Sequence, residues 1–145
     1  MRSLLIAAAA LSLLSGCAEE QRSSKTHQAA AILEPARPTH QMYALGTEIT
    51  PEGAVSARSA GDSFVRGGEV YLSVNVTSAT TPQKIEVEWR DAEGNVTDRE
   101  AQQVPSSARY VAFSPERTAE WTAGDHRVVV MIDGRKVTQM DFRMM

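Results

Sequence analysis

Cys17 is the residue of this chain whose surroundings most narrowly restrict its chemistry. It is the only cysteine among 145 residues, which excludes an intrachain disulfide and a cysteine-based zinc site. A nearly uninterrupted apolar run, Leu4–Leu14, precedes it, and Arg2 supplies a positive charge ahead of the run. This layout predicts a secretory signal peptide over residues 1–16. The run is too short to span a hydrocarbon core of ~30 Å as a permanent helix.

The four residues that end at this cysteine resemble a known motif. Leu14-Ser15-Gly16-Cys17 is similar to the lipobox of bacterial lipoproteins. In that family the thiol receives a diacylglycerol, the chain is cut just before the cysteine, and the new amine is acylated. The resemblance implies that Cys17 is a lipidation site whose acyl chains, such as palmitate, hold the protein at a bilayer. The alternative is an ordinary signal peptide that happens to be followed by a cysteine.

The residue after the cysteine indicates where in the cell the mature protein is located. Ala18 stands there instead of an aspartate, which resembles the signal for export to the outer membrane in Gram-negative lipoproteins. We therefore expect a lipid-anchored protein of the bacterial outer membrane, facing either the periplasm or the outside. The next segment, 17–41, is mostly polar and holds two prolines, which predicts a flexible tether. A helix packed on the domain through Ile32 and Leu33 is the alternative.

Beyond Cys17 the sequence offers little that could perform a reaction. It contains no glycine-rich phosphate loop, no HExxH and no GxSxG. Its three histidines are dispersed, so a metal site from His40, His126 and a carboxylate is a weaker interpretation than solvated side chains. Carboxylates between residues 86 and 100 alternate with Arg90 and Arg99, which favours a solvated sheet face over a calcium site. We expect no enzyme activity, no cofactor, no bound metal and, without a basic run, no nucleic-acid partner.

From residue 42 onward the apolar residues recur with a period of two, as in strands with one buried face. The clearest runs are 69–77, 84–90, 109–113, 126–133 and 136–144, and weaker ones are 43–50 and 53–57. "DAEG" at 91–94 predicts a hairpin turn that leads into a strand at Val96, and Asp133-Gly134 predicts a two-residue hairpin. Six or seven short strands predict an all-β, antiparallel β-sandwich over residues 42–145, with a closed barrel as the competing architecture.

The order of aromatic and turn residues in this domain carries a second resemblance. Trp89-Arg90-Asp91-Ala92-Glu93-Gly94 is followed by Trp121, Gly124, His126, Val128, Val130, Asp133-Gly134 and Phe142. This pattern resembles the immunoglobulin-like sandwiches common in exported bacterial proteins. The resemblance implies about seven strands and a core centred on Trp89. His126 departs from it, because that pattern usually has a tyrosine there; a corner hydrogen bond is then lost or made by an imidazole nitrogen.

One feature of the last hairpin predicts a binding surface. If Val128 and Val130 point inward, Val129 and Met131 point outward, and Met140 or its neighbours join them. The alternatives are that the tether or the first strand covers them, or that the methionines fill an irregular core. We therefore expect a non-catalytic interaction module that holds an envelope protein near the membrane. The competing function is binding of an envelope carbohydrate, for which Tyr43, Tyr71 and Tyr110 are the available aromatic side chains.

Overall fold

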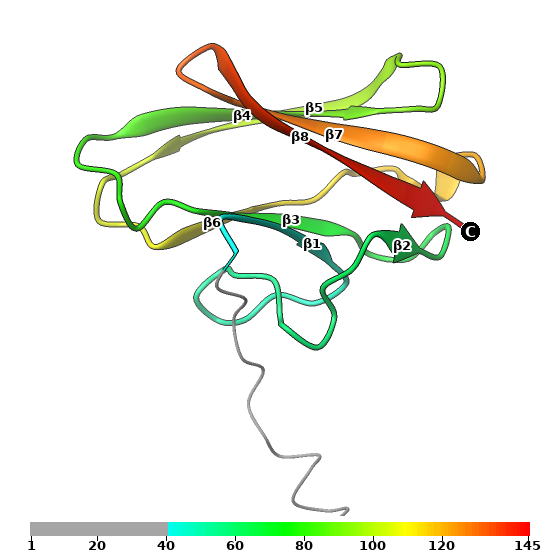
Figure 1. Cartoon of the computed structure of the whole chain (residues 1–145), viewed down its shortest axis with the longest axis horizontal. Coiled ribbons are helices and arrows are strands. Elements are labelled where there is room, and N and C mark those ends of the chain that lie inside the picture. The colour runs from blue at the N-terminus through cyan, green and yellow to red at the C-terminus, as the bar shows by residue number, and fades with distance from the viewer. Residues whose placement is uncertain (1–40) are drawn as a thin grey trace, which may run out of the picture. The chain divides into compact units, whose positions relative to one another are not determined.

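The computed structural model describes residues 41–145, which form two β-sheets packed face to face (Figure 1). One sheet has the order β1-β3-β6, formed by β1 (Tyr43–Gly46), β3 (Tyr71–Asn75) and β6 (Tyr110–Phe113). The other has the order β2-β8-β7-β4-β5, formed by β2 (Ser63–Phe64), β8 (Arg135–Met144), β7 (Gly124–Ile132), β4 (Gln83–Arg90) and β5 (Val96–Val104). All neighbouring strands are antiparallel except β2 and β8, which are parallel.

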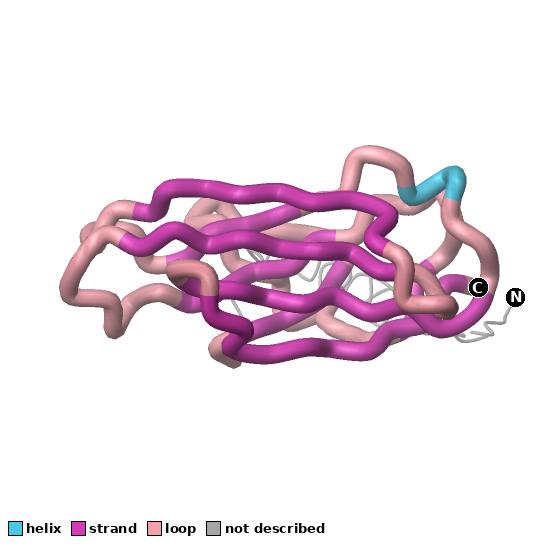
Figure 2. Tube along the Cα trace, turned by 90° about the horizontal axis from the view of Figure 1, so that it is seen from above, coloured by secondary structure: helices cyan, strands magenta, loops and turns pink. Residues whose placement is uncertain are grey.

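Helical structure is nearly absent from the described part of the chain. Its one helical turn is the 3₁₀ segment η1 (Thr118–Glu120), between β6 and β7 (Figure 2). Within residues 41–145, no helix has the length and apolar character needed to cross a membrane. The predicted signal peptide and Cys17 lie outside the described residues, as does all of the predicted tether except Gln41.

The period-two pattern located the long strands correctly. The five clear runs correspond to β3, β4, β6, β7 and β8, and the strand after "DAEG" is β5. Because two separate sheets form, the closed barrel is excluded. The prediction of a strand at 53–57 was wrong, because this segment forms no strand and its bridge between Ile49 and Val55 is an isolated one. The short strand β2 was missed, since its two residues are too few to show a period.

Both predicted turns have the backbone that their residues favour. Gly94 adopts a positive φ of 87°, and the Asp91 carboxylate accepts hydrogen bonds from the backbone and side-chain nitrogens of Asn95 at 2.7 and 3.0 Å. Asp133 and Gly134 both have positive φ, 49° and 79°, as the tight hairpin between Ile132 and Arg135 requires. These turns fix the registers of the β4–β5 and β7–β8 hairpins.

The core lies between the sheets and is centred on Trp89, which is fully buried. Leu72, Val74 and Phe113 approach it from the three-stranded sheet, and Val87, Val128 and Val130 lie on its own sheet. At one end of the core the rings form a cluster: Trp89 lies 5.9 Å from Trp121 and 6.0 Å from Phe142, centroid to centroid. Such contacts add to the area that the aromatic rings bury.

His126 belongs to this aromatic cluster and makes the hydrogen bond at the point where the pattern usually has a tyrosine. Its ring stacks on Trp121 at 5.2 Å and on Phe142 at 5.6 Å. Its Nε2 lies 2.8 Å from the carbonyl oxygen of Thr122. A carbonyl can only accept, so Nε2 must be the donor. Of the two possibilities left open by the sequence, the structure therefore shows a hydrogen bond made by an imidazole nitrogen.

The outward side of the three-stranded sheet is covered by the segment between β1 and β2 (Figure 1). Small residues there, Ala44 and Ser73, let the segment approach, and the backbone nitrogen of Val55 donates to Ser73 Oγ at 3.0 Å. A Cβ on Gly46 would lie 2.5 Å from Val55 Cγ1, so glycine is required at this close approach. Within residues 41–145, no such segment covers the outward side of the five-stranded sheet.

Candidate functional site

The outward side of the five-stranded sheet, called the outer face below, is rich in charge. It is built from alternate residues of β4, β5, β7 and β8, whose intervening residues fill the core. Six basic and four acidic side chains lie on it: Lys84, Arg90, Arg99, Arg127, Lys136, Arg143, Glu86, Glu88, Asp125 and Asp141. The rest of residues 41–145 carries five basic and eleven acidic residues. The outer face is therefore the positive side of an acidic domain.

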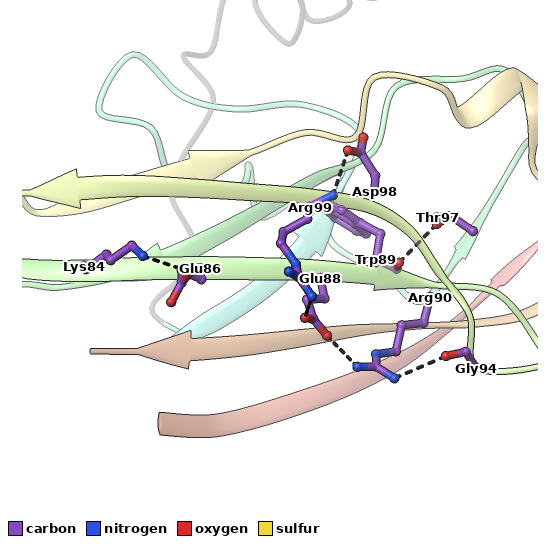
Figure 3. A network of polar contacts seen from close by, with 9 residues as sticks. All are labelled: Lys84, Glu86, Glu88, Trp89, Arg90, Gly94, Thr97, Asp98 and Arg99. Atoms are coloured by element: carbon purple, nitrogen blue, oxygen red, sulfur yellow. Dashed lines mark hydrogen bonds and ion pairs between the residues drawn. The ribbon is translucent and has the colours of Figure 1, made fainter. Parts of the chain in front are cut away.

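A buried carboxylate occupies the middle of this face. The Glu88 side chain is only 8% exposed, although it points away from the core (Figure 3). It accepts from Arg90 at 2.5 Å, and its second oxygen accepts from Arg99 on the adjacent strand. The hydrogen bond from Arg90, reinforced by that from Arg99, outweighs the burial and lowers the pKa of Glu88 below its usual range. Glu88 is thus an ionised group held between two guanidinium groups.

Arg90 is held by two different partners. Besides bonding Glu88, its guanidinium donates to the carbonyl oxygen of Gly94 at 3.2 Å, which ties it to the "DAEG" turn (Figure 3). Its Nε is buried and has no hydrogen-bond partner among the described residues. Two arginines therefore share the single carboxylate of Glu88, and the network has a surplus of donors.

Directly opposite Arg90 on the neighbouring strand stands a second arginine, Arg127. Like charges at opposite positions of an antiparallel pair are destabilising. Arg127 is drawn toward β8 by Asp141, whose carboxylate it contacts at 2.5 Å. This hydrogen bond also lowers the pKa of Asp141 below its ordinary value. The next pair along, Arg143 and Asp125, is joined at 2.7 Å.

A shallow groove of about 910 Å³ runs over this end of the outer face. The "DAEG" turn borders it, and its lining includes Arg90, Arg127, Lys136 and Arg143. Five carboxylates line it. Asp91 is engaged within its own turn, Asp125 with Arg143 and Asp141 with Arg127, whereas Asp62 accepts from the Ser63 hydroxyl and Glu93 lies on the exposed turn. The groove can accommodate a polar chain or side chains that bring further hydrogen-bond acceptors.

The structure does not assemble Val129, Met131 and Met140 into an apolar surface. Val129 does point outward, but it is only 7% exposed, because charged and polar neighbours such as Glu88 and Gln139 flank it on both sides. Met131 is half-buried beside it. Met140 stands opposite Val128 and packs against the core. The predicted patch is therefore corrected to a half-covered apolar strip, Val129 and Met131, within a charged face.

The tyrosines available for the carbohydrate alternative are dispersed. Tyr43 packs against the core. Tyr71 is the first residue of β3 and pairs with Gly46 of β1, whereas Tyr110 of β6 pairs with Asn75 at the other end of β3. All three belong to the three-stranded sheet, so none borders the groove. No aromatic platform for a sugar ring forms from these three residues.

The structure groups no set of metal ligands within residues 41–145. No group of three or more histidine, cysteine, aspartate or glutamate side chains there is arranged to hold an ion. His40 and Cys17 lie outside this part of the chain. The carboxylates of the β4–β5 hairpin are divided by the pleat: Glu88 lies on the outer face, whereas Glu100 stands opposite Val87 and lies 3.4 Å from the indole nitrogen of Trp89.

The sequence predicted that the charged residues of β4 and β5 form one solvated sheet face. This was only partly right, because Glu88 is buried on the outer face and Glu100 lies on the other side of the sheet, and the opposition of Arg90 and Arg127 was missed. Their pairing follows from the β4–β7 register, which no local signal in the sequence gives. Comparison with known proteins adds no residue to the site. No protein-family model matches the chain, and no curated protein matches it in sequence.

Proposed function

We propose that the chain is a membrane-anchored bacterial lipoprotein whose immunoglobulin-like domain is a non-catalytic module that binds another protein of the cell envelope. The motif ending at Cys17 supports the anchor, which would place the protein in the outer membrane. The strand order supports the domain type: β1-β3-β6 faces β8-β7-β4, as strands A-B-E face G-F-C in immunoglobulin domains, and β5 extends the second sheet.

The observation that carries the binding role is the outer face. It combines arginines, a half-covered apolar strip and a groove on the sheet that the β1–β2 segment leaves open. Protein interfaces are enriched in arginine and have apolar centres with polar rims. The scattered tyrosines make the carbohydrate alternative weaker than protein binding.

Site-specific photocrosslinking in the full-length lipidated protein tests the binding role. A photoreactive residue in place of Gln139, which lines the groove, should give a discrete adduct with an envelope protein. The matched control is Ala57, which is exposed on the segment covering the other sheet. Adducts that form equally from both positions, or from neither, would contradict binding through the outer face.

The anchor has its own test in Cys17→Ala. Without the thiol no diacylglycerol is attached, so we expect the protein to move from the membrane fraction to the soluble fraction or to accumulate as unprocessed precursor. Immunoblotting of fractionated cells measures this change. Mass spectrometry of the wild-type protein should show a cleaved chain that begins with acylated Cys17. A mature protein with a free thiol at this position would exclude lipid anchoring.

A further inference from the structure

We propose that the outer face recognises a carboxylate-bearing segment of its protein partner, with one carboxylate seated between Arg90 and Arg127. This inference rests on the proposed binding function and names the chemistry of the partner. It depends on the register of β4 and β7, the sharing of Glu88 and the charge distribution of the domain.

The register places two arginines at directly opposed positions of neighbouring strands. Opposed residues of an antiparallel pair have Cα atoms about 4.5–5.5 Å apart, and Arg90 faces Arg127 in this way. Each arginine is drawn aside by an acidic residue, Arg90 by Glu88 and Arg127 by Asp141. An added carboxylate at this point would relieve their repulsion and form charge-assisted hydrogen bonds with both.

The surplus of hydrogen-bond donors around Glu88 also favours binding of an added carboxylate. Glu88 serves both Arg90 and Arg99, so two guanidinium groups share one carboxylate. The Arg99 side chain is 61% exposed and that of Arg127 45% exposed, so both are accessible to a partner. An acidic segment lying along the groove would supply the acceptors that the protein itself does not provide.

Long-range charge favours an acidic partner at this face. The outer face carries two more basic than acidic side chains, whereas the rest of the described domain carries six more acidic than basic residues. An acidic partner is therefore favoured at the outer face over the rest of the domain. Inside the groove, whose lining holds four basic and five acidic residues, its carboxylate must contact the arginines directly. Such complementarity orients an encounter and gives it a dependence on salt.

Binding of a labelled peptide to the full-length protein tests the proposal. The probe is a short fluorescent peptide that alternates glutamate with threonine, and its control alternates glutamine with threonine. Fluorescence anisotropy at low ionic strength should detect the glutamate peptide only. Arg127→Gln should weaken its binding about fivefold or more, as expected from losing a hydrogen bond to a charged group. Arg117→Gln is the matched control, because Arg117 also forms an exposed ion pair, with Glu120, away from the groove.

Two further measurements separate recognition from a general effect of charge or folding. Asp141→Asn releases Arg127 and should tighten binding, whereas Glu120→Gln makes the same change of charge and should not. The melting temperature of Arg127→Gln should stay close to that of the wild type, since the loss of the exposed ion pair with Asp141 is offset by removal of the repulsion with Arg90.

The proposal is overturned if the glutamate peptide does not bind, or if Arg127→Gln and Arg117→Gln weaken binding equally. It is also overturned if phosphatidylglycerol vesicles, and not the peptide, bind in an Arg127-dependent manner, because the ligand is then a membrane surface. A crosslink from position 139 combined with no peptide binding would leave the protein-binding function standing and reject only the acidic partner.

Discussion

Trp89→Ala is expected to unfold the domain or to leave it barely stable. The indole is fully buried, lies between the two sheets and contacts Trp121 and Phe142. Replacing a buried tryptophan by alanine costs about 3–5 kcal/mol, because the transfer free energy is lost and a cavity remains. The whole domain has a free energy of unfolding of the order of 5–15 kcal/mol. Urea unfolding followed by circular dichroism measures the loss.

Trp89→Phe is the control for this substitution. It keeps an aromatic ring in the core, so it should cost clearly less than alanine. It also removes the indole nitrogen, which lies 3.4 Å from the Glu100 carboxylate. Burial raises the pKa of Glu100, and this hydrogen bond lowers it in part. An alanine variant that unfolds within about 1 kcal/mol of the wild type would show that Trp89 is not the central core residue.

Glu88→Gln is expected to lower the free energy of unfolding at neutral pH by about 1–3 kcal/mol. The glutamine has the same shape, but it cannot accept two charged hydrogen bonds, so it leaves Arg90 and Arg99 without their shared anion. Arg99 is largely exposed and regains water, which keeps the loss below that of a fully buried pair. Urea titration of both proteins at neutral pH measures the difference.

The same variant should also change the pH dependence of stability. The folded pKa of Glu88 is below its unfolded value, so its contribution is present above the unfolded pKa and is lost as the pH falls toward the folded pKa. The two stability curves should therefore converge in acid. Glu93→Gln, on the exposed turn, is the matched control and should follow the wild-type curve. A constant gap between wild type and Glu88→Gln at every pH would contradict the ionised network.

The register of β4 and β7 links the stability of the outer face to its proposed binding role. The same Glu88 that stabilises the sheet holds Arg90 in place opposite Arg127. Glu88→Gln should therefore affect both folding and peptide binding, whereas Arg127→Gln should affect binding alone. This contrast distinguishes a residue that positions the site from one that contacts the ligand.

The sequence by itself determined those features that depend on neighbours along the chain. Alternation of side chains identified the long strands, and Asp133-Gly134 and "DAEG" identified two turns. The lipid anchor at Cys17 stays a prediction. The buried place of Trp89 followed from its position on an alternating strand. These features are local, because the pleat and the backbone of a turn are set within a few residues.

The tertiary structure alone decided what covers each strand and which residues oppose one another. Alternation placed Val129 outward correctly, but flanking side chains from β4 and β8 bury it. Met140 lies on the core side, since a register shift between Val130 and Met131 changes how β8 aligns with β7. The opposition of Arg90 and Arg127 joins segments almost forty positions apart, so it depends on pairing energies summed over whole strands, which no short stretch of sequence contains.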